Sequence, residues 1–314
     1  MILSLGSLNF TPDKNKTENH MKYLILLVGA FLALSSAQAN AQRVYENNPP
    51  KGKVYVYKTV DGVDREIEVF FPKGKQASKK PVPGIILFHG GGWGGGSREA
   101  FSYQCNYFAS RGIVAATVTY RLASKKDKAE LKKNESRKRL CIPDAKSAIR
   151  WYKQHAAELG IDPKRIIAGG GSAGGHISLL ATTNPGLNDP NDPKGYDTSV
   201  AAYVLFNPAL TAGDASDSEV DFLQHVKANF PPAIAFFGSN DTWLKGWNAA
   251  QEKLKSLGNN SVETQIANGQ KHAFFNSQPW ADATLIAADK FLNKLGLIKG
   301  EPTLKTEAKL IAGP

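Results

Sequence analysis

The amino-acid sequence predicts an α/β fold with a mostly parallel central sheet flanked by helices. Two observations carry this prediction. Short apolar stretches alternate with helical segments, which is typical of parallel strands joined by helices. The length of 314 residues also fits one large α/β domain or two small ones. The expected strands of the alternating region are 84–88, 114–119, 165–168 and 201–206, followed by 233–237 and 262–266.

Two further strand-like runs, 54–57 and 67–71, come before this region. The turn residues Asp61-Gly62 separate them, so we expect an opening hairpin.

Two helices can be placed from the pattern of apolar residues. The segment 143–158 begins with Pro143 and Asp144, which suit a first helical turn, and it is followed by the stop signal Leu159-Gly160. A final helix is expected at 281–295. The polar tail 300–314 has no role that the sequence reveals.

The N-terminal residues 1–41 are interpreted as an export signal. Lys22 supplies a positive charge, 23–34 form an apolar stretch, and Ala37-Gln38-Ala39 or Ala39-Asn40-Ala41 offers a cleavage site. If translation starts at Met21, the residues before it are a non-native extension. The apolar stretch is too short to span a membrane, and no cysteine follows it for a lipid anchor. We therefore expect a secreted or periplasmic domain, 42–314, without a membrane anchor.

The chain is basic, with a formal net charge of +11, and much of the excess lies in the segment 124–139. This segment is interpreted either as a solvated loop or as a rim that faces a polyanion. No aromatic residues alternate with the charges, so we do not expect nucleic acid as a partner.

The two cysteines, Cys105 and Cys141, have two interpretations. In an exported protein an even count permits a disulfide between them. The alternative is two separate buried thiols. Neither cysteine has histidine or acidic residues clustered around it, so no metal site is expected.

The segment Gly170-Gly171-Ser172-Ala173-Gly174 lies between a predicted strand and a predicted helix. This is the context of a nucleophile elbow, a sharp turn that exposes a serine hydroxyl above the sheet. The turn brings the strand and the helix so close that Gly170 and Gly174 must lack side chains. Ser172 is therefore the candidate nucleophile. The alternative is a glycine-rich turn with an idle serine.

A serine nucleophile needs a base and an acid that orients the base, in the chain order Ser, acid, His. His272 follows the last predicted strand in a loop, whereas His225, the other late histidine, lies in a helical stretch. Asp241 follows the strand 233–237 and is the candidate acid. The fallback acids are Asp214, Asp217 and Asp221, although their spacing suits helix caps better.

The segment His89-Gly90-Gly91-Gly92-Trp93 follows the strand 84–88. Glycine runs let backbone N–H groups approach a ligand closely, as the stabilisation of an oxyanion requires. The alternative is a flexible glycine turn. His89 and His176 are expected to be structural.

Together these residues resemble the bacterial esterases of the hormone-sensitive-lipase and feruloyl/acetyl-esterase type, which have the α/β-hydrolase fold. The resemblance runs from about Tyr55 to Leu295. Its carriers are His89 to Trp93, Tyr120-Arg121-Leu122, Asp144, Ala148 to Trp151, Asp162 to Ile166, Gly170 to His176, Gly238 to Asp241 and Gly269 to Phe275. The resemblance implies a triad of Ser172, Asp241 and His272, with oxyanion donors at Gly91, Gly92 and Ala173.

The resemblance also implies a carboxylic ester hydrolase without a cofactor that works through an acyl-enzyme. The lipase-like branch carries a long N-terminal cap, which this sequence lacks, so we expect no large cap domain and an open site. Small or polysaccharide-linked esters, acetyl esters above all, are the expected substrates. The alternatives are a peptidase of the prolyl-oligopeptidase type and a carbohydrate-binding relative without turnover.

Overall fold

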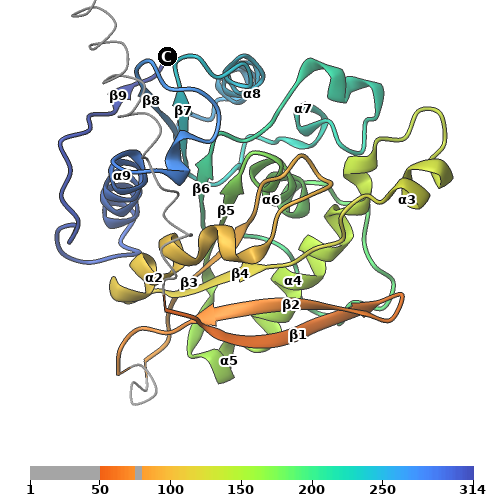
Figure 1. The fold of residues 1–314 in the computed structure, drawn as a ribbon, viewed down its shortest axis with the longest axis horizontal. Coiled ribbons are helices and arrows are strands. Elements are labelled where there is room, and N and C mark those ends of the chain that lie inside the picture. The colour runs from red at the N-terminus through yellow and green to blue at the C-terminus, as the bar shows by residue number, and fades with distance from the viewer. Residues whose placement is uncertain (1–49, 75–79) are drawn as a thin grey trace, which may run out of the picture. The chain divides into compact units, whose positions relative to one another are not determined.

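In the computed structural model, the strands within the described residues, 50–74 and 80–314, form one sheet in the order β1-β2-β4-β3-β5-β6-β7-β8-β9 (Figure 1). These residues belong to a unit that spans Arg43–Pro314. The predicted export signal lies outside the described residues. The strands are β1 Lys53–Val60, β2 Val63–Phe70, β3 Val82–Phe88, β4 Val114–Val118, β5 Ile161–Gly171, β6 Ala202–Phe206, β7 Ala233–Gly238, β8 Val262–Ala267 and β9 Ile311–Ala312.

The centre of the sheet is parallel, and its two edges are antiparallel. Strands β4, β3, β5, β6, β7 and β8 pair in parallel. The hairpin β1–β2 adds two antiparallel strands to β4, and it turns at Asp61 and Gly62, which both have positive φ. The predicted α/β fold with a mostly parallel sheet is therefore confirmed, including each predicted strand and the opening hairpin.

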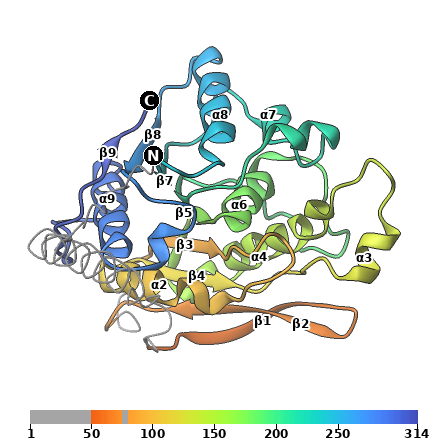
Figure 2. The same cartoon turned by 45° about the horizontal axis from the view of Figure 1, so that its top comes forward.

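Helices cover both faces of the sheet (Figures 1 and 2). One core cluster joins the sheet to the helices α4, α6 and α8, and a second joins the opposite face to α2 and α9. Side chains of β3 alternate between the clusters: Ile86 and Phe88 belong to the first, and Ile85 and Leu87 to the second. The bounds are α2 Ser102–Ser110, α3 Lys125–Glu130, α4 Ile142–Gln154, α5 Ala156–Leu159, α6 Ala173–Thr183, α7 Phe222–His225, α8 Leu244–Ser256 and α9 Trp280–Lys294.

The predicted helix 143–158 is two helices, α4 and α5, with a break at His155. The backbone of His155 leaves the helical region at ψ 15°, and its ring stacks on Trp151 with centroids 4.1 Å apart. The imidazole Nδ1 also lies 2.9 Å from the Trp151 carbonyl oxygen, so the side chain competes for helical backbone groups. The predicted stop at Gly160 is confirmed, because this residue caps α5 with φ 69°.

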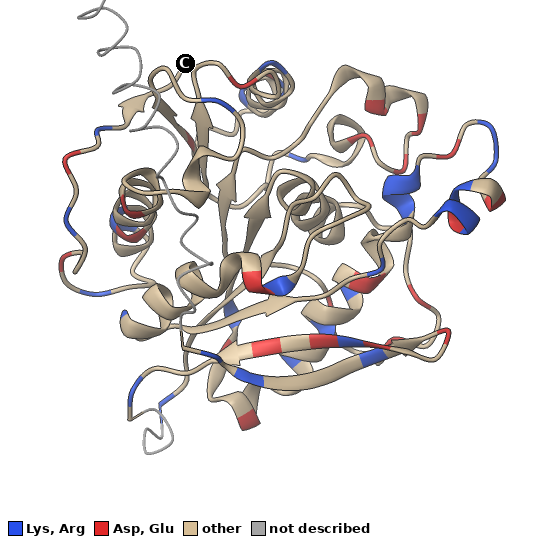
Figure 3. Ribbon diagram, in the orientation of Figure 1, with Lys and Arg blue, Asp and Glu red and all other residues tan. Residues whose placement is uncertain are grey.

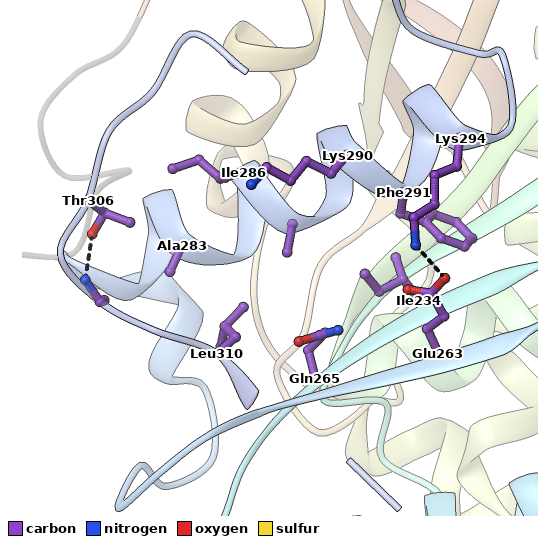
Figure 4. A pocket seen from close by; sticks show the side chains of 12 residues that line it. Ile234, Glu263, Gln265, Ala283, Ile286, Lys290, Phe291, Lys294, Thr306 and Leu310 are labelled. Atoms are coloured by element: carbon purple, nitrogen blue, oxygen red, sulfur yellow. Dashed lines mark hydrogen bonds and ion pairs between the residues drawn. The ribbon is translucent and has the colours of Figure 1, made fainter. Parts of the chain in front are cut away.

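The C-terminal tail has a structural role that the sequence did not reveal. Its strand β9 pairs with β8, and the Gly313 N–H donates to the Thr264 carbonyl oxygen at 2.8 Å. Leu304 and Leu310 pack against the second core cluster. Between the tail, α9 and β8 lies a pocket of about 410 Å³ (Figure 4). The tail therefore covers one edge of the sheet, an edge that would otherwise expose unpaired backbone groups.

The disulfide that the even cysteine count permits is not present between Cys105 and Cys141. Cys105 and Cys141 are both free thiols, and both are buried. Cys105 lies on α2 in the second core cluster, whereas Cys141 precedes α4 in the first cluster, on the other face of the sheet. The alternative of two separate buried thiols is correct. Burial raises the pKa of Cys141 to about 12 and that of Cys105 well above its usual range.

Within residues 50–74 and 80–314, every helix is too short or too polar to span a membrane.

Candidate active site

Ser172 lies at the sharp turn between β5 and α6. Its backbone has φ 52° and ψ −119°, a strained conformation for a residue other than glycine. Neighbouring backbone fixes the turn: the Ser172 N–H donates to the Phe206 carbonyl oxygen at 2.9 Å, and the Ala209 N–H donates to the Ser172 carbonyl oxygen at 3.0 Å. The strained turn is thus held by hydrogen bonds to the last residue of β6 and to the loop that follows it.

The two glycines beside Ser172 are required sterically, as the sequence predicts. A Cβ on Gly174 would lie 1.9 Å from the Phe88 carbonyl oxygen, and one on Gly170 would lie 2.3 Å from the same atom. Both distances are far shorter than any real contact. The first turn of α6 therefore packs directly on the end of β3, and no side chain fits between them.

The structure brings Ser172, His272 and Asp241 together in one hydrogen-bonded chain. His272 Nε2 lies 2.8 Å from Ser172 Oγ, and His272 Nδ1 lies 2.7 Å from Asp241 Oδ2. An ionised carboxylate only accepts hydrogen bonds, so the imidazole proton is on Nδ1 and Nε2 is free to accept from the serine hydroxyl. The Asp241 side chain is fully buried, whereas 31% of the His272 side chain is exposed.

The loops that carry Asp241 and His272 are fixed to each other. The Asn240 N–H donates to the Gln270 carbonyl oxygen at 2.9 Å, and the Gly269 N–H donates to Ser239 Oγ at 2.8 Å. The second carboxylate oxygen of Asp241 accepts the Trp243 N–H at 2.9 Å. These bonds join the ends of the neighbouring strands β7 and β8, and they set the acid beside the base.

The fallback acids take other positions. Asp221 caps α7 by accepting the Leu223 N–H, while Asp214 and Asp217 pair with Lys138 and Arg139. None of these carboxylates bonds to His272 within the described residues.

The other candidate histidines are held by backbone groups. His225 Nε2 lies 2.8 Å from the Ser218 carbonyl oxygen, and the buried His176 has Nε2 at 2.9 Å from the Val220 carbonyl oxygen. The buried His89 lies with Nδ1 2.7 Å from the Gly90 carbonyl oxygen. Burial lowers the pKa of His176 to about 3, with the nearby Lys138 as a second cause, so this ring is neutral at ordinary pH.

The glycine loop after β3 lies against Ser172. A Cβ on Gly90 would be 3.2 Å from the Ser172 Cβ. Gly91 and Gly92 follow with φ 120° and 61°. Within the part of the chain that the structure describes, no hydrogen bond uses the N–H of Gly91, Gly92 or Ala173. Ala173 is the first residue of α6, where the N–H groups lack partners in the helix. Three free donors thus lie in the segments around the serine.

The known proteins that this chain is similar to include esterases. The BD-FAE family model matches residues 67–206, which run from β2 to the end of β6. Esterase 2 of the planctomycete Thermogutta terrifontis, solved with bound propionate, superposes with a TM-score of 0.71 and 34% sequence identity. The match covers 80% of this chain and 97% of that chain. The chain belongs to the esterases with the α/β-hydrolase fold.

Two curated relatives come from Mycobacterium tuberculosis. Esterase LipC is 30% identical over 231 residues, which are 64% of this chain and 55% of the relative. The probable carboxylic ester hydrolase LipM is 27% identical over 244 residues, 67% of this chain and 54% of the relative. The chain therefore spans about half the length of these relatives. No cap domain is present among the described residues of this family member.

One wall of the site in this esterase is built around Trp93, which follows the glycine loop with φ 61°. Its ring lies 5.4 Å from the ring of His176 and 6.3 Å from that of Trp243. The ammonium group of Lys138 lies 4.1 Å from the Trp93 ring centroid and pairs with the buried Asp214. Burial lowers the pKa of Lys138 and raises that of Asp214, because both charges are removed from water.

The basic segment 124–139 is divided between these structural contacts and solvent. Lys138 is buried, and Arg139 Nε donates to Asp217 Oδ2 at 2.7 Å. The other cations of the segment are exposed, and the salt bridges of the described residues do not include them: Lys125, Lys126, Lys128, Lys132, Lys133 and Arg137. Figure 3 shows the blue of Lys and Arg gathered on α3 and the loop beside it. The interpretation as a solvated loop is thus wrong for Lys138 and Arg139, at the end of the segment. These two side chains pair with Asp214 and Asp217.

A largely apolar pocket of about 460 Å³ lies between the segments that follow β6 and the start of α8, and its lining includes Thr242 and Trp243, which follow Asp241 in the chain. Leu210, Phe222, Leu223 and Trp243 supply much of its lining. The ring of Trp243 also lies 6.3 Å from the His272 ring, so this side chain is near both the pocket and the base.

The sequence did not point to Lys138 or Asn207 as residues of this site. It offered Asp214 as a fallback acid, whereas the structure pairs Asp214 with Lys138 beside Trp93. Asn207 follows β6, is fully buried, and places its Nδ2 at 3.1 and 3.2 Å from the two ring nitrogens of His272. Its position directly after a predicted strand is the one signal that points to it. Parallel strands present their carboxyl ends at the same edge of the sheet.

Proposed function

We propose that this protein is a carboxylic ester hydrolase that works through an acyl-enzyme on Ser172. The observation that carries the proposal is the bonded chain Ser172, His272, Asp241, with separations of 2.8 and 2.7 Å. Serine at its ordinary acidity is a poor nucleophile, and a hydrogen-bonded base is what activates it.

In the first step, Ser172 Oγ attacks the ester carbonyl carbon while its proton passes to His272 Nε2. Buried Asp241 accepts the Nδ1–H, which keeps the ring in the correct tautomer and stabilises the imidazolium. Collapse of the tetrahedral intermediate breaks the bond to the alcohol, which takes the proton from Nε2. Water then repeats the sequence on the acyl-enzyme, releasing the acid and restoring the serine.

Negative charge on the carbonyl oxygen is stabilised by the N–H groups of Gly91, Gly92 and Ala173. This role is supported by their lack of partners among the described residues and by the position of the glycine loop beside Ser172. The N-terminus of α6 adds the positive end of a helix dipole at the same place. Donors that are already in position need no reorganisation when the charge forms.

The favoured substrates are short acyl esters, above all acetyl esters on carbohydrate. The Thermogutta terrifontis relative has been solved with propionate and with butyrate, both small acids. The absence of a cap domain from the described residues supports access by a bulky alcohol such as a sugar chain. The pocket of about 460 Å³ beside Trp243 is the candidate place for the acyl group.

A chain-length series of p-nitrophenyl esters tests the acyl preference. We expect the highest kcat/KM for acetate or propionate and a steep fall beyond butyrate. Acetate release from acetylated xylan, pectin and algal glycans then tests the alcohol side. A preference for long acyl chains over acetate would contradict the proposal.

Export is a further part of the proposal, and it is supported by the signal-like residues 1–41. Sequencing the N-terminus of the protein from the culture medium or periplasm tests it. We expect cleavage after Ala39 or Ala41, and an intact N-terminus in the cytoplasm would contradict it.

A further inference from the structure

We infer that Asn207 is a positioning residue that holds the His272 ring and favours its protonated form through its side-chain amide oxygen. This inference rests on the proposed function, because it assigns a role in the proton transfer at His272. Asn207 directly follows β6, and its side chain is fully buried.

The contact between the two side chains is not an ordinary hydrogen bond. Asn207 Nδ2 lies almost equally far, 3.1 and 3.2 Å, from Nδ1 and Nε2 of His272. Both ring nitrogens already have partners in the plane of the ring, Asp241 at 2.7 Å and Ser172 at 2.8 Å. A group equidistant from the two nitrogens at such a distance lies over the ring. The amide therefore packs against the imidazole and limits its tilt.

The orientation of the amide follows from what each end can bond. With Nδ2 on the ring, the N–H groups find no free acceptor there, because both nitrogen lone-pair directions are occupied or protonated. In the same orientation, the buried Asn207 Oδ1 has no hydrogen-bond partner in the described structure. A 180° rotation of the amide exchanges its nitrogen and oxygen without changing its shape. The rotated amide places an acceptor over the ring and puts the amide nitrogen at the position where Oδ1 finds no donor.

An oxygen in this position acts differently on the two states of the base. The neutral ring gains little from it, whereas the imidazolium that forms when Ser172 gives up its proton is attracted by the negative end of the amide dipole. The contact is buried, so water screens this attraction weakly. The interaction is therefore stronger in the charged state, which is the condition for an effect on rate.

The backbone conformation at position 207 favours asparagine. Asn207 has φ 41°, in the left-handed region, where asparagine is tolerated and most side chains are strained. Its N–H donates to the Phe236 carbonyl oxygen at 2.8 Å, which fixes the residue between β6 and β7. Among the described residues, the charged group in contact with His272 is Asp241, and the neighbouring Lys271 is exposed.

Two substitutions that suit the backbone test the inference. Asn207→Gly accepts the positive φ and removes the amide, and Asn207→Asp keeps the shape and adds negative charge. The measurement is the acid limb of the pH dependence of kcat/KM for p-nitrophenyl acetate, which reports the base of the free enzyme. We expect Asn207→Gly to lower the apparent pKa of this limb. We also expect it to lower kcat by about fivefold, which corresponds to the free energy of one hydrogen bond. Asn207→Asp should raise the apparent pKa of the acid limb by about one unit.

Asn260→Asp is the matched control, because it adds the same charge before β8, at the other end of that strand from His272. It should leave the limb unchanged. Titration of the His272 ring by NMR in the same variants needs no turnover, so it separates this inference from the proposed function. An unchanged ring pKa in both Asn207 variants, with only lowered thermal stability, would show a purely structural role. A raised pKa in Asn207→Gly would show that the amide nitrogen faces the ring. Either result overturns the inference.

Discussion

The ammonium group of Lys138 lies 4.1 Å from the centre of the Trp93 ring, which connects the base of the basic segment to the residue that follows the glycine loop. The same ammonium group pairs with Asp214, and both side chains are buried. A cation over an indole ring is favourable, more so when water is excluded. This contact and the ion pair therefore stabilise the loop that carries Gly91 and Gly92.

Replacing Lys138 by methionine should destabilise the protein. The substitution keeps the length of the side chain but leaves Asp214 buried without its counter-ion, at a cost of about 3 kcal/mol. The expected result is a lower Tm and a lower kcat on p-nitrophenyl acetate. Lys133→Met, at an exposed position of the same segment, is the control and should change neither value. Equal melting temperatures for the two variants would contradict the role given to Lys138.

Replacing Gly174 by alanine should disrupt the elbow. The new Cβ would lie 1.9 Å from the Phe88 carbonyl oxygen, so β3 and α6 would have to separate. Overpacking of this kind costs up to roughly 3 kcal/mol, and here it also displaces Ser172. Gly213→Ala, where the new Cβ would have no neighbour closer than 3.8 Å, is the control. Gly174→Ala should be less stable in chemical denaturation and slower in ester turnover than Gly213→Ala. An active, stable Gly174→Ala protein would contradict the packing described.

The two cysteines should behave as buried free thiols. Burial raises the pKa of both, so the fraction of reactive thiolate is small. A thiol reagent such as dithionitrobenzoate should react slowly with the native protein and with two thiols after denaturation. A reducing agent should leave the Tm unchanged. A marked fall of the Tm on reduction would instead indicate a disulfide.

Acid should destabilise the protein partly through His176. Its pKa is about 3 in the folded protein against an ordinary value of 6.5, so the unfolded chain binds the proton more readily. The free energy of unfolding should therefore fall as the pH is lowered from 6.5 towards 3, by up to about 1.4 kcal/mol per pH unit from this group. Urea unfolding of the wild type and His176→Asn at several pH values measures the difference. A wild-type curve that parallels the variant's across this range would contradict the buried neutral state.

The fold and the central residues could be predicted because their signals are local. The strands are short apolar runs, and the steric demand at Gly170 and Gly174 follows from a turn five residues long. Ser172, Asp241 and His272 occur in the expected chain order, and each follows a predicted strand. Parallel strands bring such ends to one edge of the sheet.

The errors concern contacts between distant segments, which a single sequence does not encode locally. Whether Cys105 and Cys141 meet depends on which face of the sheet each helix covers, and they lie on different faces. The pairing of β9 with β8 involves only two residues of a polar tail. Lys138 lies in a segment rich in charged residues, which is typical of a solvated loop. Its burial depends on Trp93 and Asp214, which come from elsewhere in the chain.

Hydrolysis of p-nitrophenyl acetate by Ser172→Ala tests the central claim most directly. The substitution removes one oxygen, and the control is Ser216→Ala, at an exposed serine after β6. We predict that kcat falls by at least about 10³-fold in Ser172→Ala, with the Tm almost unchanged, because the hydroxyl is the nucleophile of the acyl-enzyme. Turnover equal to that of the wild type and of the control would contradict the assignment of Ser172 and the mechanism built on it.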